Sequence, residues 1–190
     1  MKIIVLPVGK VGSRVLIEVQ RGLCKVFPES ICRISERSLQ ILQGAYDPLR
    51  RQYESSLILS EILNYAEQSE DDADSLYRVL GVTDVDLYVP GMNFIFGEAQ
   101  CPGKAAVISL YRLRPEFYGE PPNEKLFLGR TVKEAVHELG HTLGLKHCAN
   151  PLCVMYFSLH IGMTDQKQSR FCEKCSVKIN SIISSKNLKV

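Results

Sequence analysis

The sequence contains no tryptophan, no internal repeat and no segment of low complexity. It also lacks an apolar run that could cross a membrane, because the run near the N-terminus extends only over residues 3–8. No small-residue cleavage signal follows that run, so the sequence shows no export signal. These absences argue against repeat proteins and membrane-spanning proteins. We expect a cytoplasmic protein without a membrane partner.

A marked excess of either charge is absent as well. Lysine and arginine number 23 and aspartate and glutamate 21, which gives a net charge of +2. A nucleic-acid-binding protein needs a basic patch, and no cluster of lysine and arginine is evident. We therefore expect no nucleic-acid partner, whereas the net charge does not decide for or against an acidic protein partner.

The sequence does contain enough apolar residues for a core, since 45% of its 190 residues are hydrophobic. A chain of this length fits one domain. We expect a single domain over residues 1–190 and a monomeric protein. A cleft would divide this domain into an N-terminal lobe, residues 1–143, and a smaller C-terminal lobe, residues 144–190.

Histidine is scarce, yet three of the four histidines lie within residues 137–147, which read His-Glu-Leu-Gly-His-Thr-Leu-Gly-Leu-Lys-His. We expect a helix over residues 126–143. In such a helix His137 and His141 stand four apart, so both imidazoles project from one face and can bind one metal ion. The opposite face is apolar and suited to packing on a core, with Val132, Val136, Leu139 and Leu143.

Gly144 permits a backbone conformation closed to other residues, so the chain can leave the helix there and return His147 to the same ion. Three histidine ligands leave one position of a tetrahedral zinc open for water, as in catalytic zinc sites. Glu138 is placed to take and return the proton of that water. The alternative is an ordinary surface pair of histidines, but it leaves the matching glutamate, glycine and third histidine unexplained.

Four cysteines form a second candidate metal site. Four residues separate Cys148 from Cys153, two separate Cys172 from Cys175, and eighteen separate the two pairs. This spacing is typical of a closed four-thiolate zinc site. Two disulfides are the alternative, and they require an oxidising compartment that nothing in the sequence indicates. We expect two zinc ions with different roles.

The remaining cysteines and histidine have no evident place in a site. Cys24 and Cys32 lie within predicted secondary structure, where cysteine usually serves as a small buried apolar residue. Cys101 has no identifiable partner. We expect His160 to be a surface or hydrogen-bonded residue and not a ligand.

The motifs His-Glu-x-x-His-x-x-Gly-x-x-His, Cys-x4-Cys-x-Met and Cys-x-x-Cys together resemble those of the archaemetzincins, a branch of the metzincin metalloproteases. They cover residues 137–175. The resemblance implies a metzincin-like fold, a catalytic Glu138 and a methionine, Met155, in the turn beneath the catalytic zinc. It also implies two sets of zinc ligands, namely His137, His141 and His147, and Cys148, Cys153, Cys172 and Cys175.

Apolar periodicity predicts an α+β fold, an α/β-type sandwich with a mixed, twisted sheet and helices. Strands are predicted at residues 2–8, 31–34, 84–89, 93–98 and 105–113. Helices are predicted at residues 11–27, 50–67 and 126–143, and from the last cysteines onward. The final helix should pack on the domain through Val177, Ile179, Ile182 and Ile183. A turn is expected at residues 44–48, a loop at 115–123 and a solvated acidic connection or helix start at 70–72.

The edge strand that precedes the active-site helix in metzincins pairs with the extended substrate, and residues 105–112 match it by order. The alternative is an ordinary interior strand. Tyr156 is a candidate for stabilising the tetrahedral oxyanion, because the clan sometimes uses a tyrosine after that methionine. The resulting hypothesis is a zinc-dependent peptidase that acts on a peptide or protein. The alternatives are a catalytically silent zinc protein that binds peptides, and a hydrolase of non-peptide amides.

Overall fold

The computed structural model describes residues 1–69 and 76–187, and the acidic run at residues 70–72 lies outside them. Its centre is a five-stranded sheet in the order β2-β1-β5-β8-β7. The strands are β1 (Lys2–Val8), β2 (Ile31–Ile34), β5 (Tyr77–Thr83), β7 (Gly97–Ala99) and β8 (Ala105–Ser109). All neighbours are parallel except β7, which pairs antiparallel with β8 at the edge.

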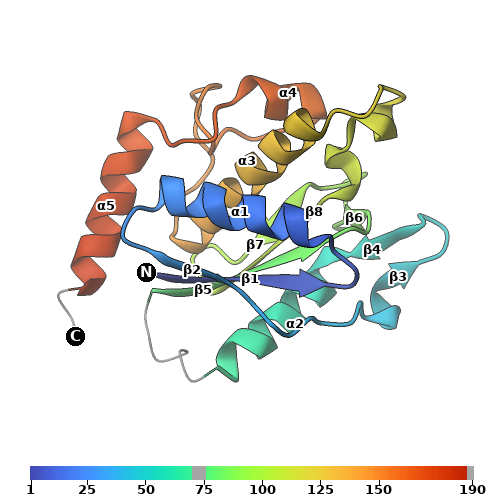
Figure 1. Ribbon diagram of the computed structural model, residues 1–190, viewed down its shortest axis with the longest axis horizontal. Coiled ribbons are helices and arrows are strands. Elements are labelled where there is room, and N and C mark those ends of the chain that lie inside the picture. The colour runs from blue at the N-terminus through green and yellow to red at the C-terminus, as the bar shows by residue number, and fades with distance from the viewer. Residues whose placement is uncertain (70–75, 188–190) are drawn as a thin grey trace.

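Helices cover both faces of this sheet, as Figure 1 shows. The helices α1 (Ser13–Val26) and α3 (Glu124–Thr142) lie on one face and α2 (Ser55–Glu67) on the other. Side chains alternate between the faces, so Leu80 and Val82 of β5 join the core under α1 and α3, whereas Val79 joins the core over α2. The predicted α/β sandwich with a mixed sheet is therefore confirmed.

The central strand β5 was missed by the sequence prediction, which placed a strand at residues 84–89. All seven residues of β5 are buried, although its sequence includes Arg78 and Gly81. Gly81 lets α2 approach the sheet closely, because a Cβ atom here would meet the end of the Ile62 side chain. Because β5 contains an arginine and a glycine, its sequence lacks the continuous apolar run that predicts a buried strand.

A second, three-stranded sheet has the order β3-β4-β6. Its strands are β3 (Tyr46–Asp47), β4 (Gln52–Glu54) and β6 (Leu87–Tyr88), and a 3-10 turn at Gln43–Ala45 precedes it. The predicted helix at residues 50–67 was wrong at its start, because residues 52–54 form β4, which pairs with β6, and the helix begins only at Ser55. Of the predicted strand at 84–89 only β6 is a strand.

Residues 105–112 were interpreted either as the edge strand or as an ordinary interior strand, and the second interpretation is correct for residues 105–109. The strand β8 lies between β5 and β7, and all five of its residues are buried. The edge strand is β7, whose three residues are only half-buried. Segments just after β8 form 3-10 turns at Tyr111–Leu113 and Pro115–Tyr118, the second within the predicted loop.

The C-terminal part contains α4 (Ile161–Gln166) and α5 (Glu173–Asn187). Ile179 of α5 is buried, but Val177 is 63% exposed, so the prediction that Val177 packs on the domain was wrong. Cys32 is buried as predicted, whereas Cys24 is exposed. His160 is exposed and immediately precedes α4, in line with a surface role.

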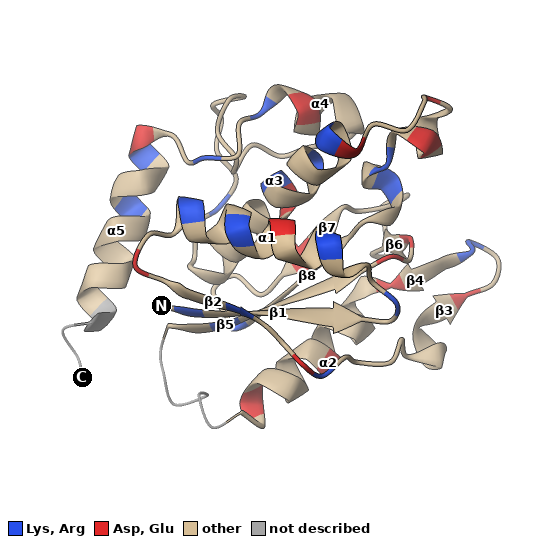
Figure 2. Cartoon of the chain, in the orientation of Figure 1, with Lys and Arg blue, Asp and Glu red and all other residues tan. Residues whose placement is uncertain are grey.

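Charged residues of both signs are spread over the surface, and both α1 and α3 carry basic and acidic residues (Figure 2). Among the described residues, no helix combines the length and the apolar character that crossing a membrane requires.

Candidate metal centres

The first centre is carried by the C-terminal half of α3, which begins two residues before the predicted helix and ends at Thr142. Asn123 caps the helix by accepting a hydrogen bond from the backbone N–H of Leu126 at 3.0 Å. Val136 and Leu139 are buried in the core on one side. The other side of the same turns presents His137 to the cleft. The apolar face of the helix packs on the core as predicted, and the face that carries His137 lies toward the cleft.

The chain reverses at Gly144, whose φ is +91°. Its backbone N–H donates to the carbonyl oxygen of His141 at 2.8 Å, and Leu145 donates to the carbonyl oxygen of Gly140 at 3.1 Å. This reversal brings His147 back to the helix. The ring centroids of His147 and His141 are 4.8 Å apart.

The three imidazoles fit a zinc ion. Their candidate ligand atoms lie within 4.8 Å of one another, and the Nε2 atoms of His137 and His141 are 3.1 Å apart. A tetrahedron with Zn–N bonds of roughly 2.0–2.1 Å has edges of roughly 3.3–3.4 Å. The Nδ1 atoms of His137 and His141 each lie 2.7 Å from a carbonyl oxygen, of Val154 and Leu145 respectively. Because a carbonyl only accepts, Nδ1 carries the proton and Nε2 keeps its lone pair for a metal.

Burial lowers the pKa of His137 well below its usual value and also lowers the pKa of His141. Both rings are therefore neutral at physiological pH, which is the form that binds a metal. Beside them, Glu138 is only 5% exposed. Burial raises the pKa of Glu138 well above its usual value, and the neighbouring carboxylate of Glu134 raises it further.

Two glycines allow other segments to approach this centre closely. A Cβ atom on Gly97 of β7 would lie 2.7 Å from Cγ of Glu138, so the edge strand lies directly against the glutamate. A Cβ atom on Gly140 would meet the sulfur of Met155. Met155 is fully buried beneath the helical turn that joins His137 to His141. This is the position that the resemblance implied for Met155.

The second centre consists of Cys148, Cys153, Cys172 and Cys175, whose sulfur atoms all lie within 4.8 Å of one another. The sulfur atoms of Cys148 and Cys172 are 3.8 Å apart, whereas a disulfide requires about 2.05 Å. All four thiols are free. A tetrahedral site with Zn–S bonds of about 2.3 Å has edges of about 3.8 Å, so the four thiols fit zinc and not two disulfides.

The local backbone favours a thiolate at one of these cysteines. Cys172 lies just before α5, and a hydrogen bond from the backbone of Cys175 lowers the pKa of Cys172 to about 7. Burial instead raises the pKa of Cys153 and Cys175. A cation among the four sulfur atoms would offset this cost of burial.

A cleft of about 490 Å³ opens in front of the three histidines. The edge strand β7 forms one side and residues 157–159 contribute to its lining. The ring of Phe157 lies 4.7 Å from that of His147. Tyr156 does not line the cleft, so the structure gives no support for its predicted role at an oxyanion. The apolar part of the lining consists of Val89, Met92, Phe94, Ile95, Phe96, Ala99, Phe157 and Leu159.

The model of peptidase family M54 matches residues 12–181 of this chain. The chain belongs to this family, the archaemetzincins. It is 44% identical to the archaemetzincin of Methanocaldococcus jannaschii over 94% of this chain and 93% of that protein. Like its relatives, it is therefore a zinc metallopeptidase.

Solved archaemetzincin structures share the fold. The crystal structure of archaemetzincin from Archaeoglobus fulgidus, complexed with malonate, is 37% identical with a TM-score of 0.78, and the match covers 94% of this chain and 99% of that chain. The zinc-dependent peptidase from Methanocorpusculum labreanum is 30% identical with a TM-score of 0.84 over 93% of this chain and 99% of that chain. The metzincin-like fold that the resemblance implied agrees with these structures.

In this archaemetzincin a buried ion pair that the sequence did not reveal lies beside the histidine centre. Nζ of Lys167 is 3.0 Å from Oε1 of Glu134, and the two side chains are 0% and 3% exposed. The interaction between Lys167 and Glu134 is an ion pair, and Nζ of Lys167 has no hydrogen-bond partner among the described residues. The hydroxyl of Thr164 donates to the same oxygen at 3.0 Å. Only tertiary structure brings these three residues together, so no sequence signal predicts the pair.

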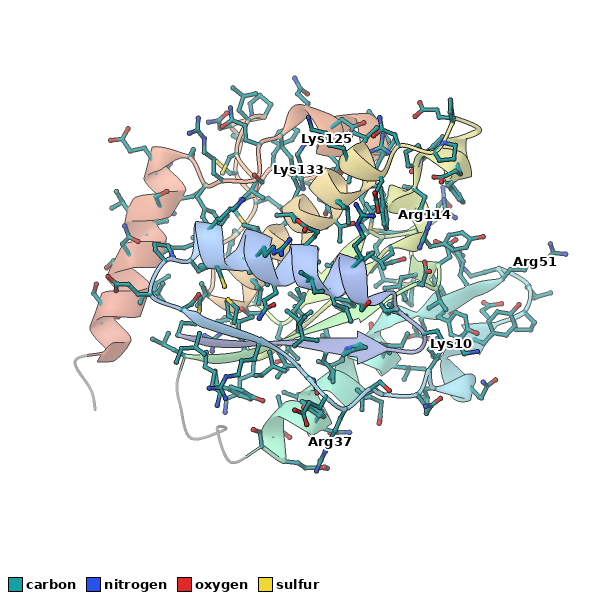
Figure 3. The ribbon with its side chains drawn as sticks, viewed as in Figure 1. Lys10, Arg37, Arg51, Arg114, Lys125 and Lys133 are labelled. Atoms are coloured by element: carbon teal, nitrogen blue, oxygen red, sulfur yellow. The ribbon has the colours of Figure 1, made fainter. Side chains whose placement is uncertain are left out.

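Two further contacts fasten α4 to α3. Lys133, labelled on α3 in Figure 3, donates to the carbonyl oxygens of Thr164 and Asp165 at 2.9 Å. Arg130 forms a bidentate ion pair with Asp165 at 2.7 Å. Together with the ion pair between Glu134 and Lys167, these contacts hold the helix that carries His137 and His141. Cys101, which had no identified partner, lines the cleft and donates weakly to the carbonyl oxygen of Leu145 at 3.5 Å.

Proposed function

We propose that this metallopeptidase hydrolyses peptide bonds at the centre formed by His137, His141 and His147. The observation that carries the proposal is the position of Glu138, which lies beside three convergent imidazoles in an open cleft. A zinc ion there would supply Lewis acidity, which lowers the pKa of water and polarises a carbonyl group.

Glu138 supplies the acid–base chemistry in this proposal. It takes a proton from the attacking water and returns that proton to the leaving amine of the substrate. The carbonyl oxygens of Val154 and Leu145 keep two imidazoles in fixed orientations.

The edge strand β7 would bind the substrate backbone. Ser109 donates to the carbonyl oxygen of Phe96 at 2.8 Å, and Gln100 donates to that of Ala105 at 3.1 Å. Backbone groups in an antiparallel pair alternate between facing the partner strand and facing away. Because Phe96 and Gln100 face β8, the alternation directs the backbone groups of Gly97 and Ala99 outward. An extended peptide can pair with these groups beside Glu138.

We further propose two zinc ions in each chain, one at the histidines and one at the four cysteines. The cysteine centre has all four tetrahedral positions supplied by protein, so its role would be structural. Free thiols of this kind persist in a reducing compartment, which is in keeping with the cytoplasm.

The test compares the wild type with Glu138→Gln on a mixed peptide library. Glutamine preserves the shape and the three histidines but cannot accept the proton of water. Cleavage should fall by roughly 10²- to 10⁴-fold while zinc content and peptide binding persist. Equal cleavage by the two proteins would contradict the proposed role of Glu138. Peptide binding without cleavage by the zinc-loaded wild type would instead indicate a catalytically silent peptide-binding protein.

A further inference from the structure

The cleft holds two carboxylates besides Glu138, and they differ in their charge environment. Glu134 faces the buried ammonium group of Lys167 at 3.0 Å, so its charge is compensated within the protein. Glu98 of β7 is half-buried and also lines the cleft. Among the ion pairs of the described residues, none involves Glu98. Lys146 lines the same cleft but forms no ion pair with Glu98.

Glu98 is nevertheless held in a fixed position. The hydroxyl of Ser55 donates to its Oε2, and the hydroxyl of Ser56 lies 3.2 Å from its Oε1. Both serines belong to the first turn of α2. Two neutral donors orient the carboxylate without adding a positive charge. The cleft therefore contains one oriented negative charge that lacks a cationic partner in the described protein.

The register of β7 places this charge relative to a bound peptide. Gly97 faces Glu138, whereas Glu98 turns toward the serines of α2, as successive residues of a strand must. A peptide that pairs with the outward backbone groups of Gly97 and Ala99 has the same alternation. Every second side chain of that peptide then lies on the same side of the extended sheet as the Glu98 side chain, while the peptide backbone passes Glu138.

Building on the proposed peptidase function, we infer that Glu98 selects substrates with a lysine or arginine side chain on this face. An oriented carboxylate is complementary to an ammonium or guanidinium group. The apolar lining of the same cleft, which includes Val89 and Met92, suits the aliphatic stem of such a side chain. Glu98 is thus a specificity-determining residue, separate from the acid–base role of Glu138.

The experiment uses pairs of otherwise neutral peptides that differ by lysine or norleucine at one position, scanned along the peptide. Relative kcat/KM values are measured for the wild type, Glu98→Gln and the control Glu120→Gln. Glutamine retains an acceptor for the serine hydroxyls, and Glu120 is an exposed carboxylate outside the cleft. The wild type should prefer lysine by roughly 10- to 100-fold at one position. Glu98→Gln should lose this preference and Glu120→Gln should keep it.

Two further measurements keep the inference testable. Raising the salt concentration should reduce the lysine preference of the wild type, since the cleft is open to solvent, and this needs no variant at Glu98. Acetylating the peptide N-terminus should leave the preference unchanged. If acetylation instead slows cleavage of the norleucine peptide as much as Glu98→Gln does, Glu98 binds the terminal ammonium group and the side-chain assignment is wrong. Equal rates for lysine and norleucine peptides would overturn the inference and leave the peptidase function intact.

A binding measurement distinguishes an error in the assignment of Glu98 from an error in the proposed peptidase function. Fluorescence anisotropy with the same labelled peptides is measured on Glu138→Gln, with and without Glu98→Gln. A lysine preference in binding that Glu98→Gln removes supports the inference even if the wild type cleaves no peptide. Equal binding of both peptides, at any cleavage rate, contradicts it.

Discussion

The histidine centre and the cysteine centre occupy neighbouring stretches of chain but differ in how the protein surrounds them. His147 and Cys148 are adjacent, yet their side chains belong to different centres. The histidine centre faces a cleft, and His137 and His141 each have Nδ1 at a backbone carbonyl oxygen. The cysteine centre joins the loop after α3 to the start of α5, and Cys153 and Cys175 are buried. A cleft leaves room for a reacting molecule, whereas a closed set of thiols holds two segments together.

The comparison predicts that the two centres release zinc at very different rates. Protein purified after zinc-replete expression should contain two zinc ions per chain by element analysis. A soluble chelator should remove the zinc of the histidine centre first, because that centre opens on a cleft, whereas four cysteines supply all four positions of the other centre. One or no zinc per chain, or simultaneous loss of both ions, would contradict the division into an exchanging and a structural site.

Cys172→Ser should destabilise the fold more than it lowers activity per folded molecule. Binding of a structural zinc ion contributes to folding by about 10 kcal/mol or more, and loss of one thiolate removes a large part of this. Thermal unfolding and turnover per folded molecule are compared with those of His147→Ala, in which the order of the two effects should be reversed. The same loss of stability in both variants would show that the centres do not differ in this way.

Lys167→Met tests whether the buried ion pair between Lys167 and Glu134 stabilises the part of the protein that carries the histidine centre. The substitution leaves the carboxylate of Glu134 buried without its partner, so stability should fall by about 3–5 kcal/mol. The matched double variant Lys167→Met with Glu134→Leu removes both charges and should regain most of that loss. Denaturant unfolding of the wild type, the two single variants Lys167→Met and Glu134→Leu, and the double variant measures the coupling. Additive losses would mean that the pair does not interact.

Gly97→Ala should impair activity with a smaller effect on stability. The added Cβ atom would lie 2.7 Å from Glu138, so either the glutamate or the edge strand must move. Stability should fall by about 1–3 kcal/mol, and turnover should slow by roughly an order of magnitude or more with unchanged zinc content. Peptide cleavage at saturating substrate, denaturant unfolding and element analysis measure the three quantities.

Gly129→Ala is the matched control for Gly97→Ala, because no atom lies within 4 Å of its added Cβ in α3. This variant should be about 1 kcal/mol more stable, since alanine favours a helix over glycine. Its turnover should equal that of the wild type. Wild-type turnover in Gly97→Ala as well would show that close contact with β7 does not position Glu138.

The features of both centres that depend on local geometry were predictable from the sequence. A spacing of four residues puts His137 and His141 on one helical face whatever surrounds the helix. Gly144 provides the turn with positive φ that returns His147, and the cysteine spacing identified a closed set of thiols. Strands at residues 2–8 and 31–34 were also predicted correctly, since residues 3–8 are a continuous apolar run and three of the four residues at 31–34 are apolar.

Only the tertiary structure showed which strand is the edge strand beside Glu138 and which groups that strand exposes to the cleft. The sequence identified neither β7 as the edge nor β5 as the centre, because a three-residue strand is too short for periodicity and β5 contains a buried arginine. The contact of Gly97 with Glu138 and the pairing of Lys167 with Glu134 join residues that lie 41 and 33 positions apart. Such contacts depend on how the helices pack on the sheet, and local residue patterns carry no information about that packing.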